Sequence, residues 1–145
     1  INVMNGELDV HKGYMGKFAV TQEEIDAMKP ALDNLSYTSY MVRVAYDESE
    51  VEVLAAVLSC AYSYEVIAKK IVANRPESVD DPFYGDWIRG YASDGYAAGN
   101  VILIETLDRL SAHYTEEQLR HLEDIFIACS RYEMVFWQMA WEMRQ

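Results

Sequence analysis

The sequence is short of cysteine, proline and basic residues, and each shortage narrows what the chain can be. Its 145 residues include two cysteines and three prolines, and 51% of them are hydrophobic. So few prolines in so apolar a chain exclude extensive disorder. Twelve Lys and Arg stand against 24 Asp and Glu, a formal net charge of −12. This disfavours nucleic acids and anionic membranes as partners, because phosphate binding needs clustered basic side chains.

Motifs for metals, membranes and export are also missing. There is no CxxC, HExxH or Glu-x-x-His spacing, and His11, His113 and His121 are scattered, so we expect no metal site. No apolar run approaches the roughly 18 residues that span a bilayer. The first residues lack a starting Met and the features of a signal peptide. We therefore expect a reduced, cytoplasmic protein, and we expect this sequence to be part of a longer chain.

Helical periodicity is strong throughout, and it predicts one all-α domain over 1–145. Three capping boxes begin at Thr21, Ser49 and Thr115, each with Glu or Gln three residues later. The segment 75–82, with two prolines and three acidic residues, is the expected linker. The helices are expected at 1–17, after 21 as far as Pro30, and at 34–47, 50–73, 84–92, 94–112 and 116–143.

The helix at 50–73 is apolar around most of its circumference, so we expect it to be central and buried. Cys60 lies within it, and Tyr64 is one turn later on the same face. Two interpretations remain open for Cys60. It is a small buried hydrophobe, as most free cysteines are, or a nucleophile whose thiol a neighbouring base activates.

Glu133 is the acidic residue in an aromatic and Met-rich segment at 129–141. An ionised carboxylate is costly to bury without a partner, so Glu133 either faces water or lines a pocket. Glu123 and Asp124 are better placed on the solvent face of the same helix, which leaves Glu133 nearer the apolar side.

Tyrosine is unusually frequent, with 11 in the chain. A buried phenol needs a hydrogen-bond partner, so clustered tyrosines are typical either of a pocket for a flat polar ring or of a tyrosine-rich core. Seven tyrosines fall in helices that we expect to be buried: Tyr37, Tyr40, Tyr62, Tyr64, Tyr84, Tyr91 and Tyr132.

Four segments together resemble the TenA/thiaminase II family. They are residues 37–41, 58–65, 82–91 and 130–140, in the order and spacing of that family. The resemblance covers essentially the whole chain. It implies a heme-oxygenase-like helical bundle without heme and without any other cofactor.

The resemblance also implies a reaction, the hydrolysis of aminopyrimidines in thiamin salvage. The substrate would be 4-amino-5-aminomethyl-2-methylpyrimidine, which loses ammonia, or thiamin, which is cleaved. By position, Cys60 would be the nucleophile that forms a covalent adduct, and Glu133 the acid–base residue. Tyr37 would polarise the cysteine, and Tyr64 and Tyr91 would bind the substrate. A homotetramer is implied as well.

Two departures from the family lead to other possibilities. Ser59 stands where the family has proline, and the family's first helices, with an Asp that binds the pyrimidine, have no counterpart. We therefore expect an N-terminally incomplete bundle. The alternatives to an enzyme are a non-catalytic pyrimidine- or thiamin-binding or regulatory protein, and a fragment that completes the fold of a partner.

Overall fold

A computed structural model describes the backbone of residues 2–144 and the side chains of residue 8 and of residues 10–144. Within this part of the chain the regular elements are all helices, which confirms the all-α prediction. The helices fall into two compact units, one ending at Ala31 and the other spanning Leu32–Arg144. The expected single domain over 1–145 stays a prediction.

The first unit contains α1 (Asn2–Lys17) and α2 (Gln22–Ala27). Ala19 adopts a left-handed conformation, with φ 54°, in the turn between the two helices. The predicted capping box at the start of α2 is present: Glu24 N donates to Thr21 Oγ1, and Thr21 N donates to the Glu24 carboxylate.

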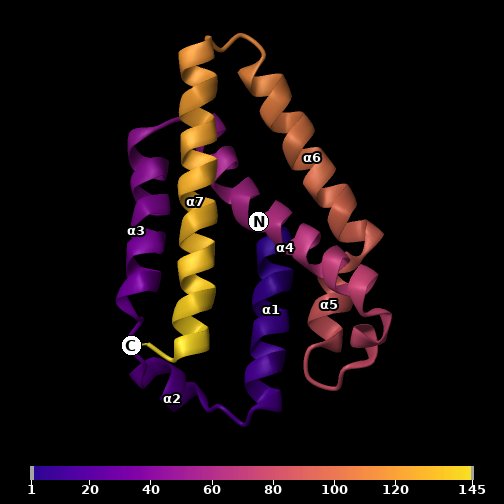
Figure 1. Ribbon diagram of the computed structural model, residues 1–145. Helices are drawn as coiled ribbons and strands as arrows, with labels where there is room; N and C mark the ends of the chain where they lie inside the picture. Colours follow the sequence, from indigo (N-terminus) through magenta and orange to yellow (C-terminus); the bar gives the residue numbers. More distant parts are fainter. Residues whose placement is uncertain (1, 145) are drawn as a thin grey trace. The chain divides into compact units, whose positions relative to one another are not determined.

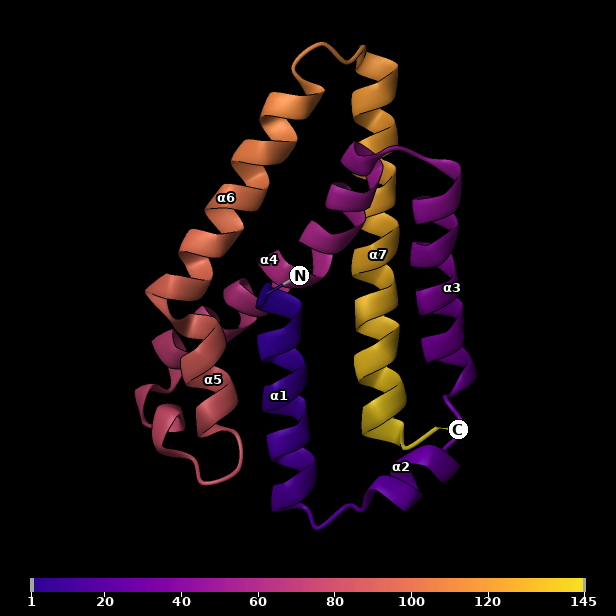
Figure 2. The same ribbon diagram turned by 180° about the vertical axis from the view of Figure 1, so that it is seen from behind.

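The second unit contains the other helices (Figures 1 and 2). Helix α3 begins two residues before the expected position. The expected linker at 75–82 is mostly a 3₁₀ helix, because Pro76 supplies a helical φ at the first position of that helix. The elements are α3 (Leu32–Asp47), α4 (Glu50–Asn74), η1 (Pro76–Asp80), α5 (Gly85–Ala92), α6 (Asp94–Ser111) and α7 (Glu116–Glu142).

Side-chain caps fix where three of these helices begin. The predicted capping boxes of Ser49 with Glu52 and of Thr115 with Gln118 open α4 and α7. A cap that the sequence analysis did not predict is Ser93, whose side chain accepts a hydrogen bond from Tyr96 N at the start of α6. Each cap is worth about 1 kcal/mol.

Helix α4 is the centre of the second unit, as predicted. It contacts α3, α5, α6, α7 and η1, while α3 and α7 lie side by side in opposite directions (Figure 1). Within the described residues, α4 is the one helix long and apolar enough to cross a membrane by length and composition. That is weak grounds for a span, because a core helix passes the same test. The absence of a membrane partner stays a prediction.

The core lies where α4 meets α3 and α7. Ala55 and Ala56 of α4 let the helices approach closely, and Val44, Ile125 and Cys129 fill the space between them. A second close approach holds α5. A Cβ on Gly85 would lie 2.5 Å from the carbonyl oxygen of Val79, so glycine is required where α5 begins against η1. The core and this contact together fix α3, α4, α5 and α7 around the residues described next.

Candidate active site

Cys60 lies midway along α4 and is partly buried. Tyr64 follows it by one turn, so the two side chains share a helix face. Neither Cys60 nor Cys129 is in a disulfide. This face of α4 carries a thiol and a phenol toward the space between α5 and α7.

Glu133 is on the buried side of α7, with 7% of its surface exposed. Its Oε2 atom is buried and receives no hydrogen bond of regular geometry from the residues that the structure describes, although the hydroxyls of Tyr37 and Tyr64 lie close enough to interact with the carboxylate. Of the two interpretations of Glu133, the structure therefore supports the pocket rather than the solvent face. A buried carboxylate oxygen without a donor is costly in a folded protein.

Tyr37 of α3 faces the same region. Its hydroxyl is also buried and has no regular hydrogen-bond partner among the described residues. Burial, followed by the charge of Glu133, the close approach of the hydroxyl to the Glu133 carboxylate, and weaker effects of Cys60 and Cys129, raises the pKa of Tyr37 far above its usual range. Tyr37 is therefore a neutral phenol close to Cys60 and Glu133. The three side chains come from three helices: Tyr37 from α3, Cys60 from α4 and Glu133 from α7.

Tyr64 and Tyr91 complete the set of predicted residues. Burial, followed by the charges of Glu133, Cys60 and Tyr91, raises the pKa of Tyr64 well above its usual range. The rings of Tyr64 and Tyr91 are 5.0 Å apart between centroids. All five residues singled out in the sequence thus fall in one part of the second unit.

Two tryptophans were missed as candidate site residues. Trp87 lies 5.7 Å from Tyr64 and 4.9 Å from Tyr91, and Trp137 lies 5.9 Å from Tyr64, all between ring centroids. Helical spacing could have found them, since Trp87 is four residues before Tyr91 and Trp137 four after Glu133.

The expectation that seven tyrosines lie in buried surroundings is wrong for two of them. Tyr62 is 44% exposed and Tyr84 is 59% exposed. Tyr62 is two positions from Cys60, which is about 200° around an α-helix, so it faces away from the site. Tyr84 precedes the first residue of α5 instead of lying within the helix.

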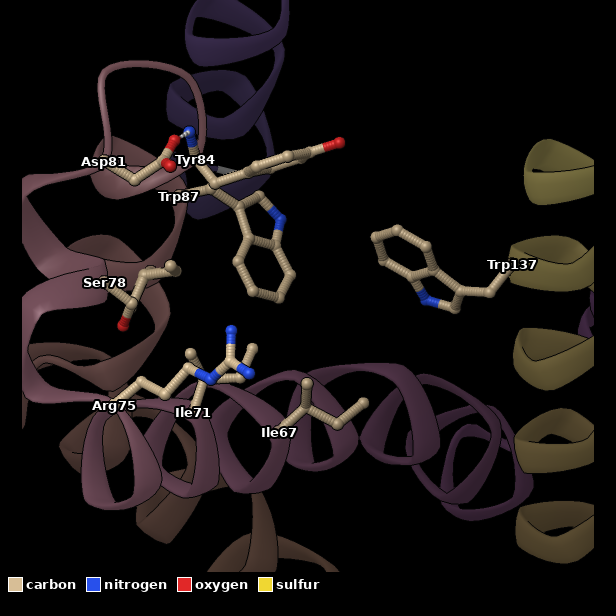
Figure 3. Close-up of a pocket in the computed structure, with 9 residues that line it drawn as sticks. Ile67, Ile71, Arg75, Ser78, Asp81, Tyr84, Trp87 and Trp137 are labelled. Carbon is tan, nitrogen blue, oxygen red and sulfur yellow. Dashed lines mark hydrogen bonds between the residues drawn. The ribbon is translucent and has the colours of Figure 1, made fainter.

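Two neighbouring cavities open beside these residues. One of about 490 Å³ is lined by Glu133, Ser63 and Trp137 among others. A larger cleft of about 750 Å³ shares Ile67 and Trp137 with it. Figure 3 shows the indoles of Trp87 and Trp137 projecting toward each other from α5 and α7, with Ile67 and Ile71 of α4 on a third side. The space suits a flat, largely apolar ligand.

A second thiol lies beneath the site. Cys129, one turn before Glu133 on α7, is fully buried. Burial raises the pKa of Cys129 to about 11; the Ser59 hydroxyl partly opposes this increase and the charge of Glu133 adds to it. The Ser59 hydroxyl donates to Ala56 O at 2.8 Å. Cys129 is therefore an inert packing thiol, and the partly buried Cys60 is the one that interacts with both Tyr37 and Tyr64.

This arrangement has the parts for proton transfer and nucleophilic attack. A carboxylate, a thiol and two neutral phenols are close together, and the carboxylate lines a cavity beside aromatic rings. Within the residues described, no group of three or more His, Cys, Asp and Glu side chains is placed to hold a metal ion.

The chain is similar in sequence to a known protein family and to proteins named aminopyrimidine aminohydrolase. The sequence model of the TENA/THI-4/PQQC family matches residues 1–143. An aminopyrimidine aminohydrolase from Helicobacter pylori is 39% identical over 141 residues, which cover 97% of this chain and 64% of the relative. Another from Halalkalibacterium halodurans is 40% identical over 141 residues, 97% of this chain and 62% of the relative.

Solved structures agree with this. A TenA homologue from P. horikoshii OT3 superposes with a TM-score of 0.79 at 26% identity, covering 96% of this chain and 63% of that one. A protein described as a TenA family transcription regulator, from Silicibacter sp. TM1040, gives 0.77 at 28% identity, with 92% and 60% covered. The heme-oxygenase-like fold is thereby confirmed.

The chain spans less than two thirds of the length of these relatives. Over that part, the match to the family runs from the first residue through α7, including the segments that hold Cys60 and Glu133. The chain belongs to the TENA/THI-4/PQQC family.

Proposed function

We propose that the protein hydrolyses aminopyrimidines, with Cys60 as nucleophile and Glu133 as acid–base residue. The observation that carries the proposal is the buried approach of the Tyr37 hydroxyl to the Glu133 carboxylate beside Cys60, in which neither Glu133 Oε2 nor the hydroxyl has a hydrogen bond of regular geometry among the described residues. Buried polar atoms left in this way are found where a ligand, a water molecule or a catalytic role accounts for them. The heteroatoms of an aminopyrimidine offer both donors and acceptors, and two relatives are named aminopyrimidine aminohydrolases.

The geometry supports a two-stage hydrolysis. The thiolate of Cys60 adds to the pyrimidine ring, and the thiol proton passes to Glu133. Glu133 then protonates the leaving amine, so that the C–N bond breaks and ammonia departs. Water, deprotonated by Glu133, takes the place of the amine, and the Cys60–ring bond breaks to regenerate the thiolate. The sum is one water consumed and one ammonia released. Cleavage of thiamin differs in one step: its second ring, a thiazolium, leaves as a neutral thiazole with the C–N bonding electrons and needs no proton, so one proton is released to solvent when water is consumed.

The remaining side chains hold the substrate and exclude water. Tyr37, kept neutral by its raised pKa, lies near both Glu133 and Cys60, where its hydroxyl polarises the reacting thiol during attack on the substrate. Tyr64 and Tyr91 present ring faces and hydroxyls to the pyrimidine, and Trp87 and Trp137 enlarge this aromatic surface. The 750 Å³ cleft gives room for a second ring beyond the pyrimidine.

An ammonia-release assay with 4-amino-5-aminomethyl-2-methylpyrimidine, run beside a thiamin-cleavage assay, tests the proposal. We expect turnover by the wild type, none by Cys60→Ala, and nearly unchanged turnover by Cys129→Ala, the matched variant of the second thiol. Full activity of Cys60→Ala would refute the assignment. Calorimetric binding of the pyrimidine without ammonia release would instead support the non-catalytic binding protein.

A cytoplasmic location and a homotetramer belong to the same proposal. Two thiols without a disulfide suit a reducing compartment. Tyr46, Ile102 and Trp141 are each more than 60% exposed, and such apolar side chains are available to contact other subunits. Light scattering after size exclusion tests the tetramer, and a monomer at micromolar concentration would contradict it.

A further inference from the structure

Three tyrosines form a layered stack between α3 and α7. The rings of Tyr37 and Tyr132 are nearly parallel, 8° apart in plane and 5.4 Å between centroids. Tyr40 packs against Tyr132 at 5.4 Å with a 43° tilt. The Arg43 guanidinium lies 5.0 Å from the centre of the Tyr40 ring. Tyr132 of α7 is thus in contact with two residues of α3 that lie one turn apart.

The position of the Tyr37 hydroxyl depends on this stack. No donor or acceptor among the described residues holds that hydroxyl by a regular hydrogen bond. Besides its interaction with Glu133, packing of the ring is what fixes the direction of this hydroxyl, and Tyr132 covers one face of the ring. Tyr132 also directly precedes Glu133 on α7, so a contact that keeps α3 in register with α7 keeps Tyr37 beside the carboxylate.

We infer that Tyr132 is a positioning residue, which holds the Tyr37 hydroxyl against Cys60 and Glu133 through ring stacking. The inference rests on the proposed function for its effect on turnover. Its structural content, that Tyr132 acts through Tyr37, stands apart from the reaction. The Tyr132 ring is what matters in this role, and its hydroxyl is dispensable.

A double-mutant cycle on the full chain tests the inference. The variants are Tyr132→Leu, Tyr37→Phe and the double variant, with Tyr132→Phe as the rescue that keeps the ring. Tyr114→Leu is the matched control, because Tyr114 also packs partly buried against the core. Tyr114 precedes α7 and lies about 25 Å along the helix axis from Glu133. Two readouts are taken: ammonia release, and the rate at which iodoacetamide alkylates Cys60 across the pH range of thiol ionisation.

We expect Tyr132→Leu to lower kcat by about 10- to 100-fold, the scale expected when a catalytic group is misplaced by about 1 Å. KM should change less. Tyr132→Phe and Tyr114→Leu should stay within about twofold of wild type. In the Tyr37→Phe background, adding Tyr132→Leu should change kcat and the alkylation profile no further. Equal effects of Tyr132→Leu in both backgrounds, or no rescue by phenylalanine, would overturn the inference.

The alkylation readout separates the two proposals. If the wild type releases no ammonia, the proposed function fails, and the cycle is decided by the alkylation of Cys60 alone. If the effects of the two substitutions on the alkylation rate of Cys60 are not additive, Tyr132 acts through Tyr37 as inferred. If they are additive, the inference is wrong. Cys129 adds no background, because it is fully buried in the folded protein.

Discussion

Glu52 and Glu133 are buried to the same extent, each with 7% of its surface exposed, in two regions with opposite electrostatics. At the start of α4, the Glu52 carboxylate accepts hydrogen bonds from Ser49 N, at 3.1 Å, and from the Ser49 hydroxyl. In the middle of α7, Glu133 Oε2 accepts none from the described residues. Burial alone therefore does not mark a functional acid. The difference lies in whether the fold supplies the partners.

The two regions also differ in the groups around the acid. Burial raises the pKa of Glu52, but the hydrogen bonds from Ser49 and the charge of His121 outweigh it, so the pKa lies below its ordinary value. The groups that interact with Glu133 are instead a thiol and phenols: Cys129, Tyr37 and Tyr64. The first region stabilises the start of a helix, and the second keeps a carboxylate available for a substrate.

The largest expected effect is on turnover. Replacing Glu133 by glutamine keeps the shape of the side chain but removes the acid–base group, so kcat for ammonia release should fall by about 10²- to 10⁴-fold. Glu52→Gln is the matched control and should retain wild-type kcat, since its role is at a helix start. Comparable losses in the two variants would remove the distinction between the two regions.

A smaller effect is expected on the free energy of unfolding, which should fall when Glu52 is replaced but not when Glu133 is replaced. Glu52→Ala removes one side of a capping box and should lower the free energy of unfolding by about 1 to 2 kcal/mol. Glu133→Gln replaces a buried carboxyl group whose Oε2 has no hydrogen bond of regular geometry among the described residues, and it should leave the free energy of unfolding unchanged or raise it by up to about 1 kcal/mol. Urea denaturation of both variants and the wild type measures this, and a destabilised Glu133→Gln protein would argue that a partner holds the carboxylate.

Below about pH 5, the dependence of the free energy of unfolding on pH should include a contribution from Glu52. Its folded pKa is below the ordinary value of 4.5, so its contribution to stability is present above that value and is lost as the pH falls toward the folded pKa. Glu52→Gln lacks this contribution. Its free energy of unfolding should therefore fall less steeply than that of the wild type below about pH 5. Parallel curves for the two proteins would show that the charge of Glu52 plays no such role.

The smallest expected effect is on the reactivity of the two thiols, which should differ because Cys60 lies in the site and Cys129 lies in the core. Burial raises the pKa of Cys129 to about 11, with the Ser59 contact opposing it. We expect iodoacetamide at neutral pH to modify Cys60 in the folded protein and to modify Cys129 only after unfolding. Peptide mapping after timed alkylation measures both rates. Equal rates in the folded protein would contradict the placement of the two thiols.

Much of the fold could be predicted from the sequence, because helix starts depend on neighbouring residues. The capping boxes at Thr21, Ser49 and Thr115 all form. The start of α3 at Leu32 was misplaced, since no Ser, Thr, Asp or Asn stands directly before it. The 3₁₀ helix after Pro76 was taken for a linker, because its composition is that of a turn.

The site was predicted less completely. The resemblance to the family singled out Cys60 and Glu133, which the residues alone left open, and the structure brings Tyr37 to both. That Glu133 Oε2 lacks a partner could not be predicted, because it depends on which side chains three separate helices present to one point. The pairing of Trp87 with Trp137, 6.1 Å apart, likewise arises from the packing of α5 against α4 near α7.

Whether Cys60 and Glu133 act as one catalytic unit is tested by the mass of the protein quenched in acid during turnover of the aminopyrimidine. We expect a covalent adduct on the peptide that contains Cys60 in the wild type, and slower formation and slower breakdown of that adduct in Glu133→Gln, because Glu133 transfers protons in both steps. Ammonia release with no adduct on Cys60 in either protein, or an adduct on Cys129 instead, would contradict this expectation.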